Sequence, residues 1–284
     1  MKKRIIITIA LLLLFFTGLS VLLYPVVSDY VNYLSQSRVI ALFFEDLSQL
    51  NETRYEEILE AAREYNKRLM EKQDRFILTE EELDEYYGIL DFTGRNVIGT
   101  LEIDIIKLKL PIYLGTSEGV LQAGIGHFEG SSLPVGGLGT HSVISGHRGL
   151  PSSTLLTNAD RLREGDIFVL RVLNETLTYE IDHIVIVEPD NIDYLEIEAD
   201  KDYCTLLTCT PYGINSHRLL LRGYRIFPEN DDGEQIYGSG NRNILRDDAR
   251  RVGSALEYVI AAVPVVLVVL IYMFIKYRKT KGRR

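Results

Sequence analysis

The chain has 284 residues, and its 40 Asp and Glu outnumber its 31 Lys and Arg, which gives a formal net charge of −9 at pH 7. Binding to nucleic acid phosphates depends on clustered basic side chains, so this acidic balance argues against a nucleic acid partner. Hydrophobic residues make up 46% of the chain, and two long uncharged runs near its ends hold part of them.

The first uncharged run covers residues 5–27 and consists mainly of Ile, Leu, Phe and Val. About 20 apolar residues cross the hydrocarbon core of a bilayer. A signal peptide is the competing interpretation, but the length of the run and the lack of a small-residue cleavage site favour an uncleaved anchor. Residues 258–275 form a second uncharged run, which we interpret as a second transmembrane helix rather than a buried core helix.

Basic residues flank both runs on their outer sides, in the tails 1–4 and 276–284. Positively charged flanks stay in the cytoplasm, so both tails are expected inside the cell and everything between the spans outside. The sequence therefore predicts a two-span protein of the cell membrane with an acidic extracellular part. That acidity could attract a lysine-bearing partner, although a solvated charged surface is the simpler explanation.

Residues 28–95 have the signals of helices. From Asn51 onwards, one helical face carries the apolar positions Tyr55, Ile58, Leu59, Ala62, Tyr65 and Leu69. Asn51 is a suitable N-cap, and acidic residues near the start and basic residues near the end suit the helix dipole. The pattern predicts an amphipathic helix that packs against a core.

Residues 96–227 have the signals of a β domain. Leu101, Ile103 and Ile105 alternate with polar residues, which predicts a strand. The apolar segments 167–173 and 177–187 flank Asn174-Glu175-Thr176 and predict a hairpin, as do residues 205–208 and 218–224 around a loop rich in turn residues. Several short strands predict a closed or nearly closed barrel. The acidic, Gly-rich stretch 228–257 is expected to be a spacer.

The two cysteines are Cys204 and Cys209. They lie five residues apart in one predicted strand, so their side chains should point to opposite faces and should not form a disulfide. A zinc site with His147 and His217 is disfavoured because the chain has neither a Cys-x-x-Cys spacing nor a helical His pair. We therefore expect no metal, and one thiol free to act as a nucleophile.

Three residues make a candidate catalytic group. Cys209 ends an apolar strand before a loop, where its sulfur would be exposed, and a thiolate needs a nearby imidazole or cation. Arg218 begins the following strand, and the hairpin could bring its guanidinium beside Cys209. His147 stands in a glycine-flanked turn from which an imidazole could project. Of the other histidines, His183 is expected to be structural, His217 to face away from Arg218, and His127 and His141 to line a groove or to pack.

The segment Thr205-Leu206-Leu207-Thr208-Cys209 resembles the TLxTC motif of sortases, the cysteine transpeptidases of Gram-positive cell surfaces. The family's histidine and basic residue match His147 and Arg218, over a resemblance covering roughly residues 95–225. The run from His127 to Gly137, the SGHRG turn, the Cys-Thr-Pro-Tyr-Gly segment and the second hydrophobic run resemble class C, the pilin-polymerising sortases. The resemblance implies a mainly β fold, a closed eight-stranded barrel behind N-terminal helices.

Class C sortases usually carry a lid with an Asp-Pro-aromatic motif before the barrel. Here Asp74-Arg75-Phe76, within residues 72–82, resembles that motif with arginine in place of proline. Asp74 and Phe76 match the family's aspartate, which approaches the active-site arginine, and its aromatic ring, which shields the cysteine. Loss of proline frees the backbone φ angle and restores an N–H, so a looser lid is expected. The alternative is that these residues merely end a helix.

The resemblance implies that Cys209 attacks the Thr carbonyl of an LPxTG-like sorting signal, while His147 protonates the leaving amine and Arg218 stabilises the oxyanion. A pilin lysine then resolves the thioester, with no cofactor. Thr208 and Thr210, which flank the cysteine, are candidate substrate contacts. The alternatives are a wall-anchoring sortase that uses a peptidoglycan amine, a non-catalytic surface binding module, and some hydrolysis by water.

Overall fold

The computed structural model describes residues 2–227, so the expected spacer 228–257, second span 258–275 and basic tail 276–284 lie outside the described residues. The chain divides into two compact units. Of the described residues, 31–227 form the unit that contains the β domain, and 2–30 belong to the other.

The N-terminal helix α1 runs from Lys2 to Ser48 with Pro25 inside it. By length and composition it is the one helix among the described residues that could cross a membrane. The helix does not end with the apolar run at residue 27, because its last part has its own buried stripe. Ile40, Phe43 and Leu47 are buried at i, i+3 and i+7, the spacing of one helical face.

Helix α2 (Glu52–Glu71) confirms the predicted amphipathic helix. The Asn51 side chain caps it by accepting a hydrogen bond of 2.8 Å from the Arg54 N–H. Its buried residues are the predicted stripe without Tyr55, which is half-buried, and with Asn66 added. The Asn66 amide bonds both the N–H and the carbonyl of Leu133, so the helix is held to the barrel by polar as well as apolar contacts.

Helix α3 (Glu80–Leu90) follows a short connection and begins with a capping box. The Thr79 hydroxyl accepts from the Glu82 N–H, and the Glu82 carboxylate accepts from the Thr79 N–H. Such reciprocal bonds satisfy donors that a helix start leaves open. Tyr86 and Leu90 are fully buried, so α3 is fixed at both its start and its inner face.

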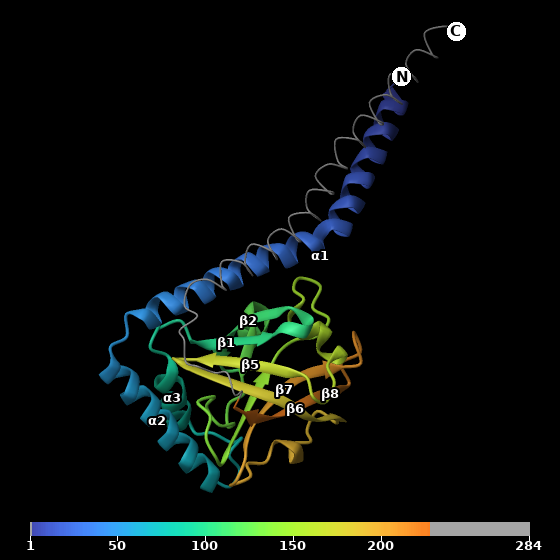
Figure 1. Ribbon diagram of the computed structural model, residues 1–284. Helices are drawn as coiled ribbons and strands as arrows, with labels where there is room; N and C mark the ends of the chain where they lie inside the picture. The colour runs from blue at the N-terminus through green and yellow to red at the C-terminus, as the bar shows by residue number, and fades with distance from the viewer. Residues whose placement is uncertain (1, 228–284) are drawn as a thin grey trace. The chain divides into compact units, whose positions relative to one another are not determined.

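Eight strands close into a barrel in the order β1-β2-β3-β4-β7-β8-β6-β5, which confirms the expected eight-stranded fold (Figure 1). The strands are β1 Val97–Ile103, β2 Leu108–Leu114, β3 Ile125–His127, β4 Thr140–Ser145, β5 Ile167–Val172, β6 Glu175–Val187, β7 Asp202–Thr210 and β8 His217–Ile226. The short helix α4 (Glu118–Ala123) joins β2 to β3, and three 3-10 turns lie at Asp104–Ile106 (η1), Leu155–Arg161 (η2) and Asp193–Leu195 (η3).

The two predicted hairpins are both present. β5 and β6 pair antiparallel around Leu173 and Asn174, and β7 and β8 pair antiparallel around the loop after Thr210. The predicted strand around Leu101 is right in part. It ends at Ile103, and Ile105 is 64% exposed because the chain enters a 3-10 turn there and leaves it through Lys107 at φ 53°.

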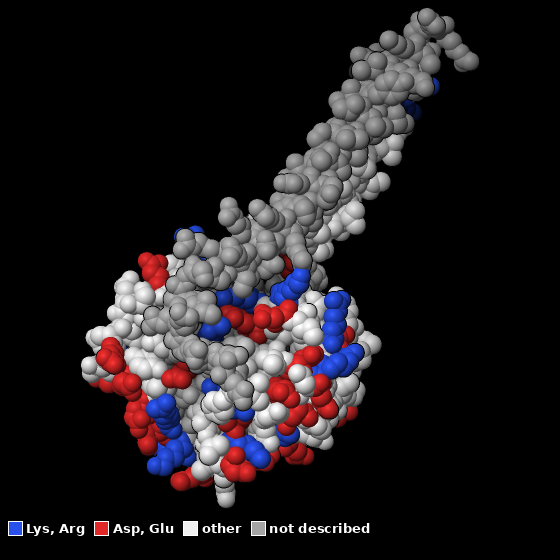
Figure 2. Space-filling model, viewed as in Figure 1, with Lys and Arg blue, Asp and Glu red and all other residues white. Residues whose placement is uncertain are grey.

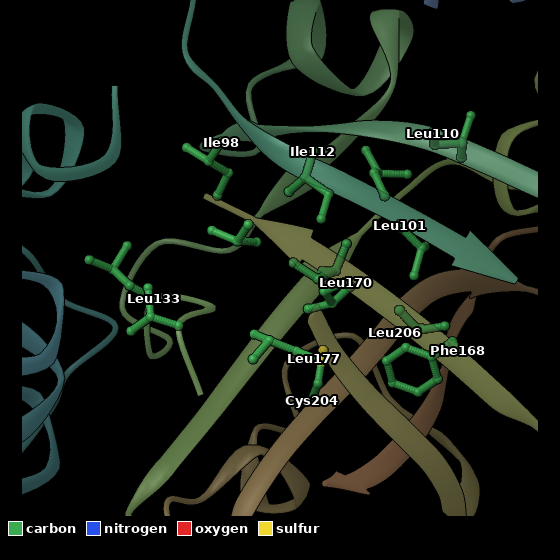
Figure 3. Close-up of a cluster of buried hydrophobic side chains, with 14 of the residues drawn as sticks. Ile98, Leu101, Leu110, Ile112, Leu133, Phe168, Leu170, Leu177, Cys204 and Leu206 are labelled. Atoms are coloured by element: carbon green, nitrogen blue, oxygen red, sulfur yellow. The ribbon is translucent and has the colours of Figure 1, made fainter. Parts of the chain in front are cut away.

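The faces of β7 point to two different hydrophobic clusters. Cys204 and Leu206 point into the barrel core among Phe168, Leu170 and Leu177 (Figure 3). Leu207, on the opposite face, belongs to a second cluster made of Val143, Val187, Leu195 and Leu220 with Phe76, Phe128 and Val185 packed against it. We call this second set the outer cluster. Cys209 lies two residues after Leu207 in β7, and residues two apart in a strand share a face.

Candidate active site

The closest relationship among the candidate residues is between Cys209 and Arg218. They are direct partners in the antiparallel pairing of β7 and β8, so their side chains leave the sheet on the same face. Cys209 is partly exposed and has a free thiol. The Arg218 guanidinium donates to the carbonyls of Asn215 and His217, at 3.3 and 3.2 Å, which fixes it at the start of β8.

His147 comes to the same end of the sheet by a different route. β4 runs parallel to β7, and the last paired residues are Ser145 and Leu207. His147 and Cys209 each lie two residues further along. The imidazole Nε2 lies 3.8 Å from a carboxylate oxygen of Glu118 in α4, too long for a hydrogen bond but close enough for attraction to an imidazolium.

The two threonines that flank Cys209, expected as substrate contacts, have hydroxyl partners within the protein. Thr208 is buried, and its hydroxyl donates to the Gly146 carbonyl at 2.7 Å. Thr210 is also buried, and its hydroxyl accepts from the Arg148 guanidinium at 3.1 Å. Both side chains point away from the face that carries Cys209, because side chains alternate along a strand.

The second cysteine has no chemistry of its own. Cys204 is fully buried in the barrel core, and burial raises the pKa of its thiol well above the usual value. A thiol in this state is a poor nucleophile. The prediction that the two cysteines face opposite sides and form no disulfide is confirmed, since both are free.

His127 and His141 pack inside the protein. Burial lowers the pKa of each to about 4, so both imidazoles are neutral at physiological pH. His127 donates to the Ser132 carbonyl and accepts from the Tyr86 hydroxyl, each at 2.8 Å. His141 donates to the Glu196 carbonyl and accepts from the Thr205 hydroxyl.

The remaining two histidines lie at the surface of the barrel. His183 stacks on Tyr194 with ring centroids 5.9 Å apart. His217 lies 3.3 Å from Glu188 and stands opposite Thr210 in the pairing of β7 with β8. Its face is therefore the one away from Arg218, as expected.

The segment 74–76 lies between α2 and α3 and packs on the barrel. Phe76 packs on the outer cluster, with its ring centroid 5.6 Å from that of Phe128. Arg75 is buried, donates to the Leu195 carbonyl and to Glu196, and lies over the Phe76 ring at 4.6 Å. Asp74 is exposed at φ 52°. Arg75 thus gives the segment an anchor that proline could not supply.

The arrangement suits acyl transfer through a thioester. A thiolate at Cys209 could attack a carbonyl, a guanidinium directly across the hairpin could hold the resulting oxyanion, and an imidazole at the same end could move a proton. Among residues 2–227, no group of three or more His, Cys, Asp or Glu side chains is placed to hold a metal ion. Fold and site together define a β-barrel protein with a cysteine, histidine and arginine site.

Comparisons with known proteins agree with this class. The model of the sortase domain matches residues 101–226. The structure resembles sortase C1 from Streptococcus agalactiae at 46% identity and a TM-score of 0.65, covering 68% of this chain and 100% of that one. The Streptococcus pneumoniae sortase C structure, described as giving insight into catalysis and pilin substrate specificity, matches at 45% identity and a TM-score of 0.61, covering 67% and 97%.

A third structure is Clostridium perfringens sortase C with the C-terminal cell wall sorting motif. It matches at 41% identity and a TM-score of 0.60, covering 67% of this chain and 99% of that one. Sortase D from Bacillus subtilis is 32% identical over 131 residues, which are 45% of this chain and 63% of that relative, less than two thirds of its length. The chain belongs to the sortase family, and the three solved structures named above are sortases C.

Sequence reasoning missed two residues that organise the site. Arg148 follows His147 directly, and its side chain is only 8% exposed, with Asp160 as its ion-pair partner. Arg75 was noticed only as a missing proline. The bond of Arg148 to Thr210 and those of Arg75 to Leu195 and Glu196 join segments far apart in the chain, so no local pattern could have indicated them.

Proposed function

We propose that the protein is a membrane-anchored class C sortase, a cysteine transpeptidase that cleaves an LPxTG-like sorting signal between Thr and Gly and joins it to a pilin lysine. The observation that carries the proposal is the direct pairing of Cys209 with Arg218, with His147 brought to the same end of the sheet by β4. The match to sortases C, one of them solved with a sorting motif, supports the substrate class.

In the first half of the reaction, the Cys209 thiolate attacks the Thr carbonyl carbon of the sorting signal. Arg218 and backbone N–H groups stabilise the oxyanion of the tetrahedral intermediate. The imidazolium of His147 gives its proton to the glycine nitrogen as the C–N bond breaks. The products are a thioester on Cys209 and a peptide with a free amine.

In the second half, a lysine amine attacks the thioester carbonyl and gives its proton to His147. The C–S bond breaks, the thiolate returns, and an isopeptide bond joins two pilin subunits. The charge balance is restored because His147 ends protonated beside a thiolate. Neither half needs a metal or an organic cofactor.

We further propose that residues 74–76 form a lid over this site. Phe76 packs on the outer cluster, which includes Leu207, and Leu207 precedes Cys209 by two residues on the same face. Asp74 and Phe76 match the family's lid motif in sequence, and Arg75 would hold the closed lid on the barrel through its bonds to the Leu195 carbonyl and Glu196. A substrate would displace the Phe76 ring to reach Cys209.

The membrane topology belongs to the same proposal. The apolar part of α1 would anchor the chain and residues 258–275 would form a second span, with both termini in the cytoplasm and the barrel outside. Acidic and basic side chains are interspersed on the barrel surface in Figure 2, which suits a domain that lies in water outside the membrane. It would act on pilins that are themselves held at the membrane.

The test is mass spectrometry of the full chain in detergent micelles with an LPxTG peptide and a lysine-bearing pilin domain. A thioester on Cys209 that passes to the lysine amine is the expected result, with Cys209→Ala as the control that forms no adduct. If only glycine-type amines resolve the thioester, the protein is a wall-anchoring sortase. If wild type forms no adduct with any of a panel of sorting peptides, the transpeptidase proposal is overturned.

A further inference from the structure

Where β4 and β7 end, the residues on either side of His147 are hydrogen-bonded to the residues on either side of Cys209. On the first side of the pair His147 and Cys209, the Thr208 hydroxyl donates to the Gly146 carbonyl at 2.7 Å, and the Gly146 N–H donates to the Leu207 carbonyl at 3.1 Å. The first bond joins the residue before Cys209 to the residue before His147, and the second holds Gly146 to β7. Together they hold the two strands side by side only as far as Gly146 and Thr208.

On the second side, Arg148 makes the matching connection. Its Nη1 donates to the Thr210 hydroxyl at 3.1 Å, which joins the residue after His147 to the residue after Cys209. His147 and Cys209 are therefore bracketed by side chain bonds on both sides. β8 holds Cys209 in place, but the pairing of β4 with β7 ends at Ser145 and Leu207. Without the second connection, the turn that carries His147 would be free to move away from β7.

Arg148 is well suited to this position because its guanidinium has several donors in a rigid plane. Besides Thr210, it donates to the Asp160 carboxylate at 2.5 Å and to the Thr157 carbonyl at 3.3 Å. Both partners lie in η2. The Arg148 side chain is 8% exposed, although its partner Asp160 is 47% exposed. Losing the bond to Thr210, which is itself buried, therefore leaves a buried donor unsatisfied.

The backbone beside Arg148 is held to the same element. The His147 carbonyl accepts from the Leu156 N–H, and the Gly149 N–H donates to the Thr157 hydroxyl, each at 3.2 Å. Gly149 itself lies at φ 80° with the Tyr212 ring so close that a Cβ would approach it to 3.0 Å. The turn that carries His147 is thus hydrogen-bonded to η2, and Arg148 also connects η2 to Thr210 in β7.

We propose that Arg148 is a positioning residue of the acyl transfer reaction, which holds His147 in reach of Cys209 through its bond to Thr210. This inference rests on the proposed function, since it gives the hydrogen bond between Arg148 and Thr210, called the tie below, a role in that reaction. Arg148 does not contact the substrate. It acts through Thr210, and a misplacement of about 1 Å between reacting groups can lower a rate by about a hundredfold.

The test compares two replacements of Thr210. Thr210→Val keeps the branched shape but removes the hydroxyl, and Thr210→Ser keeps the hydroxyl. We expect Thr210→Val to lower kcat about tenfold with KM changed less than about twofold, and Thr210→Ser to stay near wild type. A rise in KM with kcat unchanged would overturn the proposal, because it would make Thr210 a substrate contact.

A double variant tests whether the two residues act together. Arg148→Lys keeps the charge but not the planar fork, and we expect it to lower kcat at least about tenfold. Adding Thr210→Val should then cost less than about a further twofold, because the tie is already broken. Effects that multiply in the double variant, or a Thr210→Val variant with wild-type kcat, would overturn the proposal.

A second measurement needs no sorting peptide and so separates this inference from the proposed function. The rate of Cys209 alkylation by iodoacetamide reports how well His147 supports the thiolate. Thr210→Val should slow it in the direction of His147→Ala, and Thr210→Ser should not. If alkylation follows this pattern but no peptide is transferred, the tie stands and the proposed transpeptidase fails. If Thr210→Val alkylates like wild type, the inference fails whatever the peptide assay shows.

Discussion

Cys209 and Arg218 stand directly opposite each other across the β7–β8 hairpin. Cβ atoms of such partners are about 5 Å apart, so a short thiol and a long guanidinium leave the sheet from neighbouring points. The register of the hairpin therefore sets the geometry of this pair.

Replacing Arg218 tests this geometry. Arg218→Lys keeps a positive charge but loses the planar fork, and we expect kcat to fall about a hundredfold, the usual cost of removing one oxyanion donor. The measurement is steady-state transfer of an LPxTG peptide to a lysine-bearing acceptor. His217→Gln, one residue earlier on the other face, is the matched control and should keep most of the activity. An Arg218→Lys variant with full kcat would show that charge alone is sufficient.

The proposed lid, residues 74–76, should open when its anchor Arg75 is removed. Arg75→Ala loses the bonds to the Leu195 carbonyl and Glu196 and the contact with the Phe76 ring. We expect iodoacetamide to alkylate Cys209 several-fold faster in this variant. Glu196→Gln is the control, because this carboxylate is 66% exposed and its ion pair should contribute little. An unchanged rate in Arg75→Ala would mean that the segment does not restrict access to the thiol.

A glycine beneath the lid offers a second route to the same state. Gly130 lies at φ 82°, and a Cβ there would collide with the Arg75 carbonyl and come within 2.9 Å of the Phe76 Cα. Gly130→Ala should therefore displace the segment and speed up alkylation of Cys209. Gly165→Ala is the matched control, since φ is 91° and a Cβ would meet nothing within 4 Å. If both variants respond alike, backbone strain rather than the lid contact is the cause.

Only one of the two thiols should react in the folded protein. Cys204 is fully buried, and burial raises its thiol pKa well above the usual value, while Cys209 is partly exposed. Titration with an aromatic disulfide should find one thiol in the native chain and two in urea. Cys209→Ser should show none before denaturation. Rapid reaction of a second native thiol would mean that the barrel opens around β7.

The features that could be predicted from sequence are those in which the deciding interactions are local. The Asn51 cap and the apolar face of α2 follow from residues within a few turns of each other. The β7–β8 hairpin follows from alternation on either side of turn residues. Ile105 shows the limit of such patterns, because a 3-10 turn takes over from a strand whose alternation continues in the sequence.

The features that could not be predicted depend on residues far apart in the chain. The parallel pairing of β4 with β7 joins residues 140–145 to 202–207, and nothing in either segment indicates the other. The partners of the Thr208 and Thr210 hydroxyls were not predicted. They are Gly146 and Arg148, which the parallel pairing brings near.

The buried histidines should make the protein less stable in mild acid. His127 and His141 have a pKa of about 4 in the folded state, against about 6.5 when unfolded, because burial disfavours the charged form. The unfolded chain therefore binds more protons than the folded one between about pH 6.5 and 4, and stability falls as pH falls through that window. From pH 7.5 to 5 the loss should be about 2 kcal/mol for each histidine. Urea unfolding of the full chain in micelles, followed by the near-ultraviolet circular dichroism of its tyrosines, measures this loss. His141→Gln can keep a donor for the Glu196 carbonyl and an acceptor for the Thr205 hydroxyl but cannot titrate, so it should remove about half of the pH dependence. A slope that is the same in His141→Gln as in wild type would assign the acid sensitivity to other groups.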